Sequence, residues 1–193
     1  MKKSVIIILV IVGVIVLWAI NGYNSLVSLE EQVQTKWANV ETQYQRRADL
    51  IPNLVNTVKG YASHEKQTLE DVVNARSKAT QMTINPGELS AENIAEYQRA
   101  QGEVSSALGR LLAISESYPD LKANQNFLEL QAQLEGTENR ISVARREFNE
   151  TAKNYNTQIR RFPKNIIAGI FGFSKMSYFE AEAGTEKAPT VEF

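Results

Sequence analysis

The chain has 193 residues, with 21 Lys and Arg against 22 Asp and Glu, a single His and no Cys, a length that allows one domain of ordinary size. The absence of Cys excludes a disulfide scaffold, a Cys-ligated metal site, a thiol nucleophile and a lipidated N-terminal cysteine. One His excludes a multi-histidine metal site, and a formal net charge of −1 argues against broad nucleic-acid binding, which needs a basic face. We therefore expect no cofactor, no metal ion and no nucleic-acid partner.

The first element is an apolar run that follows Lys2 and Lys3. As a helix its sixteen residues would reach roughly 24 Å, slightly less than the ~30 Å hydrocarbon core, and the flanking lysines, Trp18 and Tyr23 suit the two interfaces. A cleaved signal peptide would end in an A-x-A-like site, which is absent, and a buried core helix would not need to be apolar on all sides. We predict an uncleaved membrane anchor over residues 1–20, formed by Val5, Ile6, Ile7, Ile8, Leu9, Val10, Ile11, Val12, Gly13, Val14, Ile15, Val16, Leu17, Trp18, Ala19 and Ile20.

The basic residues at the two ends of this anchor indicate its orientation. Lys2 and Lys3 precede the anchor, whereas Glu30 and Glu31 come before Lys36, the first basic residue on the far side. By the positive-inside rule, we expect a single-pass protein of the cell (inner) membrane, with a short cytoplasmic N-terminus and an extracytoplasmic domain.

Helical periodicity without any strand pattern follows the anchor. Helices are predicted over 26–48, 52–82, 90–117 with Ser90 as N-cap, and up to Phe162-Pro163. The last helix carries a seven-residue repeat typical of a coiled-coil seam, made of Phe127, Leu134, Ile141, Phe148, Tyr155 and Phe162.

The predicted fold class is all-α: an N-terminal transmembrane helix, then an antiparallel up-and-down four-helix bundle over 21–163 with long coiled-coil-like helices. The connections at 49–51, 83–90 and 118–121 are short, which favours antiparallel neighbours. Pro52 leaves two alternatives at the first connection, a chain reversal or a kink in one long helix. We favour the reversal, because a kinked rod would leave a long apolar stripe exposed.

A second apolar run lies near the end of the chain, where an even number of helices would bring it back to the membrane. It is only nine residues long and cannot span. We expect residues 164–179 to lie in the bilayer interface or to pack on the base of the stalk; the alternative is a cap over the bundle end. Its candidate interface residues are Ile166, Ile167, Ile170, Phe171 and Phe173, and a flexible acidic tail is predicted over 180–193.

The third helix carries small residues on one flank, because Ala95, Gly102 and Gly109 also recur every seven residues. A glycine inside a helix costs about 1 kcal/mol relative to alanine, so such a flank indicates close approach of another backbone. The fourth helix or a second subunit could supply that backbone, and we favour the contact within the chain.

Motifs for catalysis are missing. His64-Glu65 resembles the start of an H-E-x-x-H zinc site, but position 68 is Thr and the chain has no other His. No phosphate-binding loop and no nucleophile with a recognisable base occurs. The arginine pairs are interpreted as ion pairs on helix surfaces rather than an anion site, and they are Arg46-Arg47, Arg145-Arg146 and Arg160-Arg161. We predict that the protein is not an enzyme and has no catalytic residues.

The sequence resembles the LemA family of bacterial membrane-anchored proteins over nearly its whole length. The blocks that carry the resemblance are Tyr23-Asn24-x-Leu26-Val27, Gln45-Arg46-Arg47-Ala48-Asp49-Leu50-Ile51-Pro52-Asn53-Leu54-Val55, Val58-Lys59-Gly60-Tyr61-Ala62-x-His64-Glu65, Ser117-Tyr118-Pro119-Asp120-Leu121-Lys122-Ala123, Phe127-x-x-Leu130-x-x-x-Leu134, Glu138-Asn139-x-Ile141-x-x-Ala144-Arg145, Tyr155-Asn156 and Phe162-Pro163. The resemblance implies one membrane helix, an up-and-down four-helix domain and no established catalytic residues. Relatives beside membrane metalloproteases and in magnetosome membranes imply a part in envelope organisation or quality control.

Two functions compete on this sequence. The first is a membrane-anchored helical scaffold or adaptor of the bacterial cell envelope, whose partners are the lipid bilayer, an envelope protein such as a membrane protease, or a second copy of the chain. The alternative is a membrane-tethered ligand-binding or sensory module that uses an inter-helix cleft or the Arg-rich surface.

Overall fold

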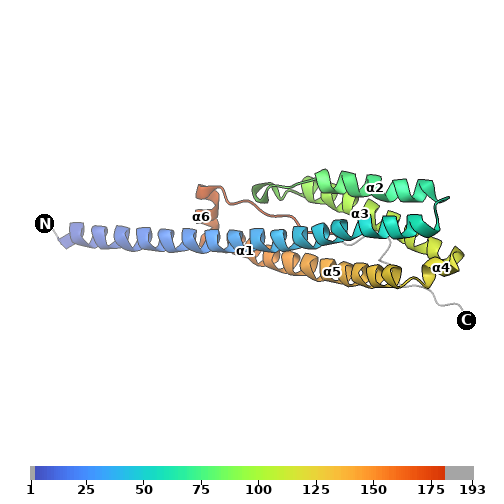
Figure 1. Cartoon of the computed structure of the whole chain (residues 1–193). Helices are drawn as coiled ribbons and strands as arrows, with labels where there is room; N and C mark the ends of the chain where they lie inside the picture. The colour runs from blue at the N-terminus through green and yellow to red at the C-terminus, as the bar shows by residue number, and fades with distance from the viewer. Residues whose placement is uncertain (1–2, 181–193) are drawn as a thin grey trace, which may run out of the picture. The chain divides into compact units, whose positions relative to one another are not determined.

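The computed structural model describes residues 3–180, and every regular element in that range is helical. The α-helices are α1 (Lys3–Tyr61), α2 (Lys66–Gln81), α3 (Ala91–Ile114), α4 (Pro119–Lys122), α5 (Gln125–Arg160) and α6 (Lys164–Phe171), with 3₁₀ turns η1 (Pro86–Glu88) and η2 (Ser115–Ser117) (Figure 1). The all-α prediction is confirmed. The predicted acidic tail lies outside the described residues, apart from Glu180.

The described chain forms two compact units. The first unit contains residues 3–47 and 134–176, which make up most of α1, most of α5 and all of α6. The second unit contains residues 48–133 and 177–180, which include the end of α1, the start of α5 and the shorter helices α2, α3 and α4.

The N-terminal part of α1 is an apolar helix that packs against almost nothing. Its most apolar window of 18 residues is 6% buried, whereas the core helix of a soluble domain would be mostly buried. By length and composition it is the one helix in residues 3–180 that could cross a membrane. No break separates this segment from the rest of α1, which continues directly into packed residues.

In the first unit α5 packs antiparallel to α1. The rings of Trp37 and Phe148 meet edge to face with their centroids 5.5 Å apart, and Lys36 pairs with Glu147 one residue before each. Further along α1, Arg47 pairs with an earlier residue of α5, Glu138, so the two helices run in opposite directions. The core between them contains Leu26, Val33, Trp37, Val40, Tyr44, Ile141, Phe148, Ala152 and Tyr155.

In contrast to the predicted chain reversal at 49–51, α1 continues as one helix through Pro52. A proline inside a helix lacks the N–H that would bond to the carbonyl four residues earlier, here that of Ala48. The side chain of Arg76, on α2, donates its Nε–H to this same carbonyl oxygen at 2.7 Å. The predicted chain reversal is wrong. The helix continues through Pro52, and a side chain from another helix satisfies the carbonyl that the proline leaves without a donor.

The stripe that a long helix was expected to expose is covered in the second unit. Ile51, Leu54 and Val58 are all buried. The chain reverses after them, over residues 62–65, where the N–H of Glu65 donates to the carbonyl of Ala62 at 3.1 Å. The helix predicted over 52–82 is consequently shorter and begins at Lys66 as α2.

Helix α3 follows the prediction closely. Ser90 is its N-cap, and its Oγ accepts a hydrogen bond from the N–H of Asn93 at 3.2 Å. The predicted apolar stripe is buried at every large position within the helix, namely Ile94, Tyr97, Val104, Leu108 and Leu111.

The seven-residue repeat of the last helix is buried over five of its six positions. Phe127, Leu134, Ile141, Phe148 and Tyr155 lie in the cores of the two units, but Phe162 is 80% exposed. Helix α5 ends at Arg160, so Phe162 no longer follows the helical face that buries the others.

Removing Arg76 should destabilise the protein mainly while Pro52 is present. Arg76→Met would leave the largely buried Ala48 carbonyl without a donor, and we expect it to lower the free energy of unfolding by about 1–3 kcal/mol. In a Pro52→Ala background the amide restored at position 52 can donate to that carbonyl, so the same change should cost much less. Thermal unfolding of the four proteins in detergent micelles measures this coupling, and equal costs in both backgrounds would contradict it.

Candidate functional site

The candidate site is the place where α6 meets α1, which we call the stalk base. It comprises α6, Gly172 and Phe173 together with Gly22, Tyr23 and Ser25 of α1. All of these residues belong to the first unit. Figure 1 shows α6 lying across α1 just beyond the apolar segment.

Three kinds of contact hold α6 on α1. The side chain of Ile167 occupies the space where any larger residue at Gly22 would place its Cβ, so glycine permits this close approach. The ring of Tyr23 contacts Phe171 and Phe173, with centroids 4.8 Å and 5.7 Å away. The Nζ of Lys164 donates to Ser25 Oγ at 2.9 Å. Packing, ring contact and a hydrogen bond therefore fix the helix from both ends.

The chain leaves α6 through a left-handed glycine. Gly172 has a φ of 77°, a conformation that side chains with a Cβ rarely adopt, and its N–H donates to the carbonyl of Ala168. The N–H of Phe173 donates to the same oxygen at 3.0 Å. This cap turns the chain so that Phe173 reaches Tyr23.

The predicted interface residues of α6 divide between two faces. Ile167 is buried against α1 and is not available to another molecule, and Phe173 is half-buried. Ile166, Ile170 and Phe171 are 48%, 72% and 56% exposed. One face of this short helix is therefore used inside the unit, while an apolar face remains open.

The chain after α6 is held on α5 by Asn156. This buried side chain donates from Nδ2 to the carbonyl of Met176 at 2.8 Å and accepts the Met176 N–H on Oδ1 at 2.9 Å. One amide side chain thus satisfies both the N–H and the carbonyl of Met176. Asn156 lies next to the buried seam residue Tyr155, but nothing in the sequence marks Met176 as its partner.

The small flank of α3 faces open space. Ala95, Gly102 and Gly109 are exposed, and a Cβ added at either glycine would meet no heavy atom within 4 Å. The contact within the chain that we favoured for this flank is therefore absent among residues 3–180. The flank is small and exposed rather than a broad apolar patch.

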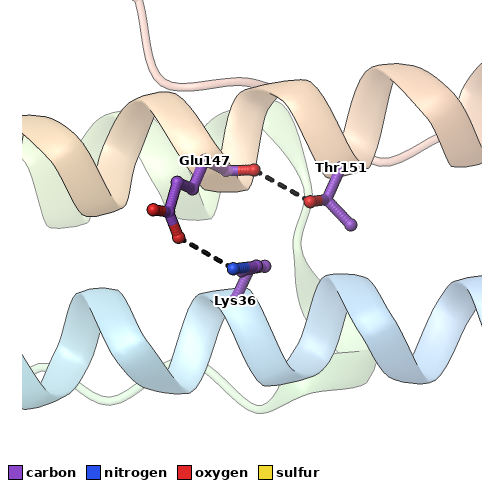
Figure 2. Close-up of polar contacts among 3 residues, drawn as sticks. All are labelled: Lys36, Glu147 and Thr151. Atoms are coloured by element: carbon purple, nitrogen blue, oxygen red, sulfur yellow. Dashed lines mark hydrogen bonds and ion pairs between the residues drawn. The ribbon is translucent and has the colours of Figure 1, made fainter.

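The first unit carries an ion pair between its two long helices (Figure 2). Lys36 Nζ lies 2.7 Å from Glu147 Oε2, and Lys36 holds the pKa of the Glu147 carboxyl below its usual value. Thr151 of α5 donates its hydroxyl to the Glu147 carbonyl at 2.9 Å. That hydroxyl is engaged within its own helix.

Arg47 is the one arginine of the predicted pairs that is fully buried, with 1% of its surface exposed. Its Nη1 donates to Glu138 Oε1 at 2.8 Å, and its guanidinium lies 5.1 Å from the centre of the Tyr44 ring. Its spacing from Val40, Tyr44 and Ile51 places it on the buried stripe of α1, a signal that the sequence analysis did not use. Its charge is engaged by structural partners rather than offered to a ligand.

Burial raises the pKa of two titratable groups of the same helix pair, Tyr155 on α5 and Glu30 on α1. Burial, and then the nearby carboxylate of Glu30, raises the pKa of the Tyr155 phenol to about 12. Burial and the neighbouring Glu31 raise the pKa of Glu30. The Tyr155 hydroxyl has no hydrogen-bond partner in the described chain.

Open grooves occur in the described part of the second unit, two of which are lined by polar side chains. One, of about 430 Å³, lies between α2 and α3, where Lys78 pairs with Glu103 at 2.9 Å and Arg110 with Asp71 at 3.7 Å. The other, of about 390 Å³, is lined mainly by amides and hydroxyls: Asn53, Asn56, Thr57, Asn126, Glu129, Leu130 and Gln133. His64 is exposed in the turn after α1, and no group of three or more potential metal ligands occurs in residues 3–180.

Comparison with known proteins gives consistent matches. The profile of the LemA family matches residues 36–193. Magnetosome protein MamQ of Magnetospirillum gryphiswaldense is 30% identical over 182 residues, which cover 84% of this chain and 66% of that protein. Magnetosome protein MamQ 1 of Paramagnetospirillum magneticum is 28% identical over 175 residues, covering 82% and 64%. Protein LemA of Metamycoplasma hominis is 23% identical over 173 residues, covering 88% and 74%. This chain therefore spans slightly less than two thirds of the length of these magnetosome relatives.

Replacing Asn156 should release the chain after α6. Asn156→Ala removes both bonds to the buried Met176 backbone and should lower the free energy of unfolding by about 1–3 kcal/mol. Asn156→Asp keeps an acceptor for the Met176 N–H but places a buried carboxylate oxygen against the Met176 carbonyl, so at neutral pH we expect a loss at least as large as that of the alanine variant. Hydrogen exchange of the Met176 amide measures the effect locally, and unchanged protection in the alanine variant would refute this role.

Glu30→Gln should stabilise the protein at neutral pH. The folded state raises the pKa of this carboxyl and therefore favours its protonated form. The stability that results is fully present below the unfolded pKa near 4.5 and is lost as the pH rises through the folded pKa. The neutral variant should therefore gain stability at pH ~7, by less than about 1 kcal/mol, and the gain should vanish toward pH ~4. Thermal unfolding across that range tests this, with the exposed Glu150→Gln as control; a gain independent of pH would contradict it.

Proposed function

We propose a function on the premise that this chain belongs to the LemA family: it is a membrane-anchored helical scaffold or adaptor of the bacterial cell envelope. In this role it binds envelope proteins or further copies of itself and holds them at a set distance from the bilayer. The proposal includes no catalytic activity.

The observation that carries the proposal is the continuity of α1. The helix passes from the exposed segment Val5–Ile20 to the packed residues Leu26 and Val33 without a linker. At 1.5 Å per residue, the part of α1 from position 21 to 47 extends roughly 40 Å beyond the anchor. A partner bound along this rod would be held in a fixed relation to the membrane, as a scaffold requires.

The architecture proposed for the scaffold is an up-and-down four-helix bundle with coiled-coil-like helices. The antiparallel packing of α5 on α1 supports it in the first unit. In the second unit the reversal over 62–65 and the packing of α2 on α3 support it.

The way in which buried and half-buried polar side chains are used supports a structural rather than a catalytic role. Arg47, Arg76 and Asn156 are bound to Glu138, to a helix carbonyl and to the Met176 backbone. The alternative, an anion-binding or sensory module, would draw on the groove between α2 and α3. Both cations there are already paired with carboxylates, so an anion would have to displace those partners, and this favours the scaffold.

For localisation, we propose that α1 crosses the inner membrane once and that the domain is extracytoplasmic. The apolar, unpacked N-terminal part of α1 supports the anchoring. The distribution of basic residues around it, with Lys2 and Lys3 before the span, supports the orientation.

Single cysteines test partners and orientation in one preparation, because the chain has no cysteine of its own. With Gly102→Cys in native membranes, we expect bismaleimide to yield a crosslinked complex and a membrane-impermeant maleimide to label the protein in spheroplasts. Glu92→Cys, also exposed on α3 but off the small flank, is the matched control for the crosslink.

Each readout has a result that contradicts the proposal. Recovery of the monomer alone from membranes in which known complexes crosslink would contradict the scaffold. Labelling that requires broken cells would overturn the orientation and leave the scaffold intact.

A further inference from the structure

The open face of α6 is largely exposed in the described chain, although the ring of Phe171 also contacts Tyr23 of α1. Ile166 and Ile170 lie one turn apart and are 48% and 72% exposed, and Phe171 beside them is 56% exposed. The opposite side of the same helix buries Ile167 and Ala168. A helix of eight residues that exposes large apolar side chains in this way needs an apolar surrounding on that face.

The position of α6 along α1 identifies that surrounding. Its contacts with α1 fall at Gly22, Tyr23 and Ser25, and Gly22 lies two residues, or about 3 Å of helix rise, beyond the end of the exposed apolar segment at Ile20. Trp18 and Tyr23, both exposed, lie at the same level and are residue types that favour membrane interfaces. The open face of α6 is therefore continuous with the apolar surface of the anchor.

The direction of α6 suits an interfacial helix. It lies across α1 (Figure 1), and a helix that spans a bilayer stands within a few tens of degrees of the membrane normal. A helix that crosses it therefore runs broadly along the membrane surface. Eight residues reach only about 12 Å, so α6 can lie in the interface but cannot span.

The charged residues next to α6 in the sequence are all basic. Between positions 160 and 175 the chain has Arg160, Arg161, Lys164 and Lys175 and no acidic residue. Arg160 and Arg161 are exposed, and their side chains form no ion pair or hydrogen bond with another residue of the described chain. Basic side chains beside an apolar helix face complement the phosphates of lipid headgroups.

We propose that α6 is a second membrane contact, which lies in the interfacial region of the bilayer that α1 spans. Ile166, Ile170 and Phe171 enter the outer part of the acyl region, and Arg160 and Arg161 lie at the phosphates. This inference rests on the proposed anchoring by α1. It implies that the first unit stands on the membrane at two points, the spanning helix and α6.

Depth-dependent quenching in vesicles tests the contact on the full chain. Single-cysteine proteins Ile170→Cys, Val10→Cys and Val73→Cys are labelled with a polarity-sensitive fluorophore. They are reconstituted in phosphatidylcholine vesicles that contain anionic phosphatidylglycerol, which attracts basic side chains. The vesicles carry spin-labelled lipids with the quencher near either the headgroup or the chain end. Val73 is the matched control, because it is an exposed apolar residue on α2.

The expected pattern separates the two proposals. The label at position 170 should shift its emission to the blue and lose intensity mainly with the shallow quencher, position 10 mainly with the deep quencher, and position 73 with neither. Quenching at 10 but not at 170 would overturn the interfacial contact and leave the anchor intact. No quenching at 10 would overturn the anchoring itself, and equal quenching at 73 and 170 would reduce the effect to unspecific adsorption.

A variant that keeps the fold separates insertion from mere proximity. Ile166→Glu replaces an exposed residue and leaves the contacts of Ile167 and Phe171 with α1 intact. In this background the label at 170 should lose its blue shift and its shallow quenching, while position 10 is unchanged. Retention of both signals would contradict insertion of this face.

Discussion

The rest of the structure depends on one constraint, the continuity of α1 as a single helix from Lys3 to Tyr61. Three parts of this helix have different neighbours. The N-terminal part packs against almost no protein, the next part packs against α5, and the last part lies in the core of the second unit. A helix can pass through all three surroundings because its backbone groups are satisfied internally, whatever surrounds its side chains. Pro52 is the one place where this internal pairing fails, and Arg76 restores it from outside.

Polar side-chain contacts between elements fix how the helices lie against one another. Apolar stripes alone permit neighbouring registers, because a shifted stripe still buries its leucines and valines. Arg47 with Glu138 and Lys36 with Glu147 each join one residue of α1 to one of α5, which singles out a register in the first unit. Asn156 does the same for the chain after α6, since its amide matches only one pair of backbone groups. The stability that such pairs add is modest, so their main effect is on specificity.

The sequence predicts the elements that depend on local pattern. The seven-residue repeat of α5, the Ser90 cap and the stripe of α3 follow from spacing alone. The turn at 62–65 was missed because Pro52 is the stronger local signal, and its cost is offset by a side chain 24 positions further along the chain. The two faces of α6 could not be assigned either, because Ile166 and Ile167 are chemically identical and only the fit against Gly22 distinguishes them. Local rules thus predict the helices, whereas the site depends on pairings that are distant in sequence.

Because no linker separates the proposed anchor from the packed part of α1, the rotation of these two parts about the helix axis is also fixed relative to one another. Each residue of an α-helix turns the next side chain by about 100°, so the segment between Ile20 and Leu26 fixes the rotation of the α5-facing side of α1 relative to the proposed anchor. A partner bound to one side of that anchor would therefore also set the direction in which the first unit presents its surface. The number of helical residues between the proposed anchor and the first packed residue therefore sets both the rotation of the first unit about the helix axis and its distance from the anchor.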